Sequence, residues 1–136
     1  MTVVTDLIHN SKAVVAVDVQ AVASAGDVTG EIIDMQGFYA GLLNLSLGST
    51  ASSKVKVKSL KQSDKSDMSD SEDIPASNLE GLAVGTDIET LKSVKCINFV
   101  PTKRYVQAVV TTTTNGAVVG ATAVLFGADI AGTINE

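Results

Sequence analysis

The chain has 136 residues, of which 45% are apolar, 18% are charged and 4% are aromatic. This composition predicts one folded domain with an aliphatic core and excludes a disordered chain. The formal net charge of −5 argues against nucleic acid as a partner, because domains that bind it present clustered basic residues. One cysteine and one histidine exclude an internal disulfide, a cysteine-based zinc site and a multi-histidine metal site. We expect no secretory leader, and no apolar run approaches the roughly 20 residues of a membrane helix.

The N-terminal segment, residues 1–10, precedes the first predicted strand. It contains four aliphatic residues, Val3, Val4, Leu7 and Ile8. Two alternatives stay open: the segment packs on its own domain, or it is an arm that orders on a partner. After it, β-branched residues at alternate positions predict a strand over Ala13–Val19, and a further strand is expected over Val28–Met35.

The segment Phe38–Leu47 shows the period-two alternation of a strand with one dry and one wet face. We expect Tyr39 to share the dry face with the leucines at 43, 45 and 47, and Asn44 and Ser46 to lie on the other face.

The segment Lys54–Lys58 alternates in the same way, with Val55 and Val57 on one face. Its other face consists of the lysines, Lys54, Lys56 and Lys58. These lysines either line a solvated face, protect a sheet edge against unwanted pairing, or contact an acidic partner.

Residues 63–81 are expected to form a polar acidic loop. Eight of the fifteen acidic residues lie between Asp64 and Glu89. The carboxylates that follow Ser63 are Asp64, Asp67, Asp70, Glu72 and Asp73. Oxygen-rich loops bind calcium, but the central glycine and closing glutamate of the twelve-residue calcium loop are not in place here. We therefore expect a solvated loop without a metal ion.

The C-terminal third reads as strands. One is expected over Leu91–Phe99, and a hairpin is expected from Arg104–Thr114 and Ala117–Phe126. Asn115 and Gly116 between them suit a type I′ turn, which needs positive φ at both positions. A two-residue turn places Thr113 opposite Val118, Val109 opposite Thr122 and Tyr105 opposite Phe126.

The count is six to eight short strands with no helix that the pattern supports. Residues 1–136 are therefore predicted to form a single all-β domain, an antiparallel β-sandwich or jelly-roll-like fold with the Asn-Gly hairpin at its C-terminal end.

No constellation for catalysis emerges from the residue types. His9 lies in the N-terminal segment, where geometry is least well held. Cys96 is expected to be a small buried core residue, because free cysteine is among the most buried types. We expect no catalytic residue, no cofactor and no metal ligand, and hence no enzyme.

Three segments give the sequence a resemblance to known proteins. They are Asp34-Met-Gln-Gly-Phe-Tyr39 with the strand after it, Lys54–Ser63 with Ser63-Asp64 opening a polar loop, and Phe99-Val-Pro-Thr-Lys-Arg-Tyr-Val-Gln-Ala-Val-Val110. Over roughly residues 12–127 the chain resembles small virion proteins of tailed bacteriophages, of the capsid decoration or cement type.

The resemblance implies a non-catalytic role: a β-sandwich or jelly-roll module that self-associates as a dimer or trimer and clamps neighbouring subunits. The expected partner is the major capsid protein, bound on the capsid exterior, with neither nucleic acid nor membrane as partner. The negative charge suits the outside of the shell, away from packaged DNA. For the interface, we name Val3, Val4, Leu7 and Ile8 as an arm contact and Lys54, Lys56 and Lys58 as an electrostatic contact.

Two alternatives remain at this point. The first is another virion part, in the tail, the neck or a fibre base. The second is an ion- or carbohydrate-binding β-sandwich module, against which the absence of tryptophan and the scarcity of aromatic side chains argue.

Overall fold

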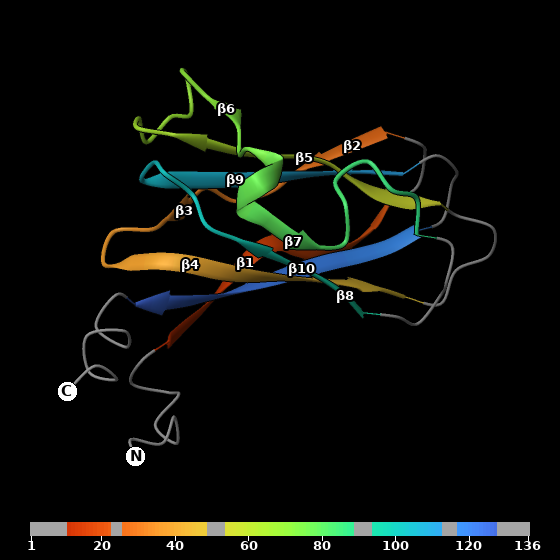
Figure 1. The fold of residues 1–136 in the computed structure, drawn as a ribbon. Helices are drawn as coiled ribbons and strands as arrows, with labels where there is room; N and C mark the ends of the chain where they lie inside the picture. Colours follow the sequence, from red (N-terminus) through yellow and green to blue (C-terminus); the bar gives the residue numbers. More distant parts are fainter. Residues whose placement is uncertain (1–10, 23–25, 49–53, 89–93, 113–116, 128–136) are drawn as a thin grey trace, which may run out of the picture.

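The computed structural model describes residues 11–22, 26–48, 54–88, 94–112 and 117–127. Two antiparallel sheets stack face to face (Figure 1). Sheet A runs in the order β1 (Ser11–Val22), β10 (Ala117–Gly127), β4 (Phe38–Leu47), β8 (Val94–Phe99) and β7 (Leu79–Gly81). Sheet B runs in the order β2 (Gly26–Thr29), β9 (Tyr105–Thr112), β5 (Val55–Ser63) and β6 (Glu72–Asp73), and β3 (Ile33–Asp34) also pairs with β9. The all-β sandwich that the alternation predicted is confirmed.

The described residues hold ten strands, more than the six to eight expected. The excess comes from strands of two or three residues, β3, β6 and β7, which are too short to show a period. One short 3₁₀ turn, η1 (Ala76–Asn78), precedes β7.

The core lies between the sheets because every second side chain of each long strand points inward. Sheet A contributes the fully buried Leu43, Leu45, Ile97, Phe99 and Leu125, and sheet B contributes Val57, Val106 and Val110. With so few aromatic residues, these aliphatic side chains provide most of the buried apolar area that stabilises the fold.

Phe99 is the largest fully buried side chain, and it depends on a glycine. Gly41 pairs with Phe99 across β4 and β8. A Cβ at Gly41 would lie 2.3 Å from the Cζ atom of the Phe99 ring. The ring therefore fills the space that a side chain at position 41 would occupy.

The predicted strand Val28–Met35 is two strands, β2 and β3, because the chain leaves the sheet at Gly30. The N–H of Gly30 donates to the Ala108 carbonyl of sheet B, and the N–H of Glu31 donates to the Ala16 carbonyl of sheet A, both at 2.8 Å. This segment therefore joins the two sheets along one side of the sandwich. A Cβ at Gly30 would lie 2.3 Å from the Ala16 oxygen, so the crossing requires glycine.

The predicted C-terminal hairpin is wrong. β9 pairs with β5, β2 and β3 in sheet B, whereas β10 pairs with β1 and β4 in sheet A. Tyr105 consequently lies opposite Asp34 and Ser63, and Phe126 lies opposite Ser11 and Ala40. The strand bounds were nearly right, but their alternation suits a buried position in either sheet, and an Asn-Gly pair does not force its flanking strands to pair. Asn115 and Gly116 themselves lie outside the described residues.

The segment 63–81 is more structured than the polar loop that we expected. It contains β6, η1 and β7, and it buries Met68 and Ile74. Ile74 donates its N–H to the Leu60 carbonyl of β5. The segment therefore covers the side of the sandwich at β7 and β6, the sheet edges opposite β1 and β2; η1 and β7 lie in front of the sheets in Figure 1.

Candidate functional site

The connection between β3 and β4 and the loop between β8 and β9 meet at one end of the sandwich, the left end in Figure 1. The N–H of Met35 donates to the Arg104 carbonyl at 2.8 Å, and Asp34 pairs with Tyr105 across β3 and β9. Residues 35–39 and 100–104 line an open hollow of about 470 Å³. We call its lining the end surface: Met35, Gln36, Phe38, Tyr39, Val100, Pro101, Thr102, Lys103 and Arg104.

Arg104 holds the two segments together. Its Nε and one terminal nitrogen each donate to a different oxygen of Asp34 at 2.9 Å, and that same terminal nitrogen donates to Gln36 Oε1 at 2.7 Å. Such a two-pronged pair fixes orientation as well as distance. The hydrogen bonds from Arg104 and from the Gln36 N–H lower the pKa of Asp34 from 3.8 to about 2. The guanidinium also lies over the Tyr105 ring, 5.0 Å from its centroid.

A second brace fixes the loop between β8 and β9. Gln62, fully buried in β5, donates its Nε2 to Thr102 Oγ1 at 3.0 Å and accepts from the Thr102 N–H at 2.8 Å. The neighbouring Lys103 contacts Glu72 at 2.5 Å and Asp64 at 3.8 Å. The hydrogen bond to Glu72 raises the pKa of Lys103. Gln62 of sheet B thus holds Thr102, and the acidic turn, residues 64–73, holds Lys103.

Between these braces the end surface exposes apolar side chains. Tyr39 is 48% exposed and Val100 is 38% exposed, while the nearby charges of Asp34, Arg104 and Lys103 are already paired. A rigid, partly apolar hollow with its charges satisfied suits contact with a protein surface. We had placed Tyr39 on the dry face with the leucines; it lies outside because the β4–β10 register shifts between Phe126 and Gly127, at the start of β4.

The outer face of sheet A is a second candidate surface. Hydrogen-bonded neighbours share a face, so the register defines rows across the sheet. The first row is Val15, Thr122, Asn44 and Cys96; the second is Ala13, Val124, Leu42 and Asn98; the third is Gly120, Ser46 and Val94. None of these side chains carries a charge at neutral pH. Glu80 of β7 continues the second row at its margin.

The outer face of sheet B differs in kind. It carries Asp27 on β2, and Lys56 and Lys61 on β5, beside Thr111 and Gln107 of β9. Lys58 Nζ lies 2.6 Å from Asp27, and Lys61 Nζ lies 3.6 Å from Asp73. The hydrogen bond from Lys58 lowers the pKa of Asp27. These pairs are solvent-exposed, so this face is a solvated, charged surface.

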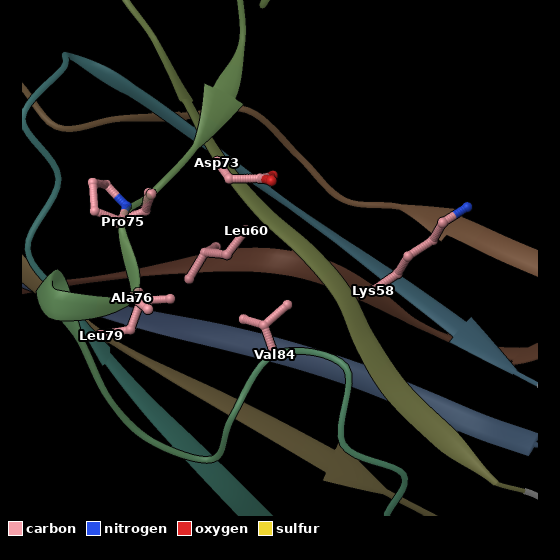
Figure 2. Close-up of a pocket in the computed structure, with 8 residues that line it drawn as sticks. Lys58, Leu60, Asp73, Pro75, Ala76, Leu79 and Val84 are labelled. Atoms are coloured by element: carbon pink, nitrogen blue, oxygen red, sulfur yellow. The ribbon is translucent and has the colours of Figure 1, made fainter.

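A shallow groove of about 330 Å³ follows the side of the sandwich closed by residues 74–84. Figure 2 shows Leu60 of β5 between Pro75, Ala76 and Leu79 on one side and Val84 on the other, with the Lys58 ammonium pointing away. An adjoining hollow of about 440 Å³ shares Ala76, Leu79 and Val84. The groove is lined mainly by apolar atoms, and its charged lining residues are Lys58 and Asp73.

The lysines that we named for an electrostatic contact divide in the structure. Lys58 is paired with Asp27; Lys56 lies two residues earlier in β5, and Lys54 immediately precedes the strand. The β5 edge beside them is hydrogen-bonded: Val55 exchanges two backbone bonds with Ile88, and Gly85 donates to Val57. The expected inward position of Val55 and Val57 is confirmed. The arm residues Val3, Val4, Leu7 and Ile8, and His9, lie outside the described residues.

Cys96 is not a buried core residue. It is exposed in β8, on the outer face of sheet A, and its Sγ donates to Asn44 Oδ1 at 3.0 Å. Ile97, its neighbour, takes the inward position. Free cysteine is usually buried, but side chains alternate along β8, so Cys96 points outward where Ile97 points inward.

The carboxylates of the acidic turn bond to side chains and backbone of the same region. Asp70 accepts from the Ser63 hydroxyl, and Asp67 accepts from the Ser69 N–H at 3.0 Å; both bonds lower the pKa of the carboxyl concerned. Among the described residues no group of three or more acidic, histidine or cysteine side chains could hold a metal ion.

Reasoning from the sequence missed the pairing of Asp34 with Arg104. The two residues are 70 positions apart, and no local pattern connects them. The signal that could have found it is indirect: both lie in segments on which the resemblance rests, Asp34–Tyr39 and Phe99–Val110.

Comparison with solved structures finds a similar fold. No protein family profile and no curated protein matches the chain. In fold, the chain is similar to the crystal structure of the SPBc2 prophage-derived protein YomS, with a TM-score of 0.52 and 14% sequence identity over 85% of this chain and 92% of that one. At this identity the match shows a shared fold. In the part of the chain that the structure describes, no helix has the length and apolarity to span a membrane.

Proposed function

We propose that this protein is a structural component of a tailed-phage particle, a capsid decoration protein that binds the outside of the major capsid protein lattice and stabilises the mature head. The observation that carries the proposal is the end surface. Two of the segments on which the resemblance rests, distant in sequence, converge there on one braced, partly apolar hollow. The fold shared with a prophage-derived protein supports the phage origin in this proposal.

The end surface is the contact that we assign to the shell. Arg104 and Gln62 hold its loops before any partner binds, so little conformational entropy is lost on association. Tyr39 and Val100 supply exposed apolar area, and tyrosine is enriched in protein interfaces. A modest contact suffices on a lattice, because a self-associating protein that bridges neighbouring subunits gains from effective concentration. Binding only to the assembled shell stabilises that shell by mass action.

The test is co-sedimentation of the purified protein with capsids stripped of it. We expect saturable binding at on the order of hundreds of copies per shell, as a quasi-symmetric lattice offers. Saturation at about six or twelve copies would instead indicate a neck, tail or fibre-base component. No binding to capsids at all would refute the decoration role.

A matched pair of variants tests the surface. Val100→Arg places a charge on the end surface, and Ile32→Arg places one on an equally exposed aliphatic side chain, 38% against 41%, outside the hollow. We expect Val100→Arg to weaken capsid binding by about tenfold or more, since an unpaired charge in an interface is costly. Ile32→Arg should bind like the unaltered protein.

Two further variants test the contacts named from the sequence. Deleting residues 1–10 tests the arm contact, and replacing Lys54, Lys56 and Lys58 by alanine tests the electrostatic contact.

A further inference from the structure

The outer face of sheet A has no assigned role in the proposal above. Its first and second rows cross β1, β10, β4 and β8 without a charged side chain, in a chain whose net charge is −5. The third row runs from Gly120 to Val94, beside the β1 bulge that holds the exposed Asp18 and Val19. We infer that this face binds a second copy of the same chain, so that two sandwiches pack sheet to sheet.

Electrostatics selects this face for self-association. Two copies of an acidic protein repel each other wherever their carboxylates approach. On the outer face of sheet A, the first and second rows are uncharged across four strands, and carboxylates lie at the margins: Asp18 in the β1 bulge opposite Gly120, and Glu80 of β7. Depletion of charged side chains at the centre is also the compositional mark of protein–protein interfaces. The centre of the face is therefore a surface on which two copies can meet without bringing charged side chains together.

The polar side chains on the face favour an identical partner. Asn44, Asn98, Ser46 and Thr122 each carry both a donor and an acceptor. In a two-fold dimer the same patch faces itself, and groups that both donate and accept can pair with their own copies. A lysine or carboxylate in the same position could not. This property separates a second copy from a charged partner.

The apolar side chains on the face supply burial. Val94 is 59% exposed and Val15 is 49% exposed. Val19 packs over Gly120, where an added Cβ would lie 2.6 Å from its Cγ2 atom, and is itself 79% exposed. These three valines are among the seven large apolar side chains that the described residues leave exposed. Face-to-face packing of two sheets, about 10 Å apart, would bury them together.

The experiment is sedimentation equilibrium of the full chain, without capsids, from micromolar to sub-millimolar concentration. We expect a dimer or a closed oligomer built from it. Thr122→Arg, in the first row of the face, should raise the dissociation constant by about tenfold or more. Thr29→Arg, an exposed threonine in the outer strand β2 of sheet B, is the matched control and should leave it unchanged. Circular dichroism checks that both variants fold, and Ser46→Arg replaces Thr122→Arg if that variant does not.

Cys96 provides a second measurement, because it lies on this face and is the single cysteine of the chain. Its modification by a bulky polyethylene-glycol maleimide should slow as the protein concentration rises, and should stay fast in Thr122→Arg. A chain that is monomeric throughout, or an oligomer in which Cys96 stays equally reactive, overturns the inference. Because no capsid enters these measurements, their outcome is independent of the capsid-binding test.

Discussion

The outer faces of the two sheets cover the same core but differ in chemistry. The face of sheet A is uncharged along the row from Val15 to Cys96. The face of sheet B carries exposed ion pairs, Lys58 with Asp27 and Lys61 with Asp73. The inward side chains of both sheets are mainly aliphatic, and Gln62 and Thr112 of sheet B are buried polar exceptions. Fold and surface chemistry are therefore set by alternate residues of the same strands.

The outward residues of a β-strand can keep a face solvated or leave apolar area for contact with a partner. Exposed ion pairs contribute little to stability because water and salt screen them, so the charges of sheet B chiefly keep that face solvated. An uncharged outer face has no such effect and leaves apolar area available for contact. A solvated, charged face is thus less favourable to bury against a partner than an uncharged one.

The largest effect is expected from Phe99→Ala, which breaks the support that both faces share. Phe99 is completely buried and packs across Gly41, and removing such a ring costs about 3–5 kcal/mol of unfolding free energy. Urea denaturation measures the loss. Val100→Ala, one residue along and partly exposed, is the control, with an expected change within about 0.5 kcal/mol. Similar losses in the two variants would contradict the core assigned here.

A smaller loss is expected from Gly41→Ala, which adds one methyl group under the Phe99 ring. The new Cβ would lie 2.3 Å from the ring, and overpacking of this kind costs about 1–3 kcal/mol. The double variant Gly41→Ala with Phe99→Leu should be more stable than the sum of the two single losses predicts, because the smaller side chain leaves room for the methyl group. Strictly additive losses would show that the two positions do not compete for space.

Much of the fold could be read from the sequence where alternation is regular. The strand Phe38–Leu47 has the observed bounds of β4, and the valines at 55 and 57 point inward as expected. Pairing could not be read in the same way. β9 and β10 each alternate, and alternation says which side chains are buried but not which sheet buries them.

The end surface was less predictable because it depends on contacts across the chain. Asp34 and Arg104 become neighbours only when β3 pairs with β9, and Thr102 is held by a buried glutamine forty residues earlier. Cys96 is exposed because side chains alternate along β8 and its neighbour Ile97 points inward. Residue type alone pointed to the opposite position.

The ion pair of the end surface gives a pH dependence that the uncharged rows on the outer face of sheet A should not show. Asp34 has its pKa lowered from 3.8 to about 2 by Arg104 and the Gln36 N–H. A lowered pKa stabilises the folded state above pH 3.8, and this contribution is lost as the pH falls toward about 2. The stability difference between the unaltered protein and Asp34→Asn should therefore be constant near neutral pH and shrink over that acidic range. Urea denaturation at several pH values measures it, and a difference that persists at pH 2 would argue against the pair as its source.

The smallest effect is expected from Lys58→Ala in sheet B, the most direct test of the charged face. Lys58 and Asp27 are 2.6 Å apart, but their side chains are 55% and 42% exposed, so screening should leave little net stabilisation. We expect a loss smaller than that of Asp34→Asn, and one that disappears in high salt. Lys56→Ala, on the same strand, serves as the matched control for removing one positive charge. A larger loss of unfolding free energy in Lys58→Ala than in Asp34→Asn would contradict this expectation. It would show that the ion pairs on the outer face of sheet B contribute to the stability of the sandwich.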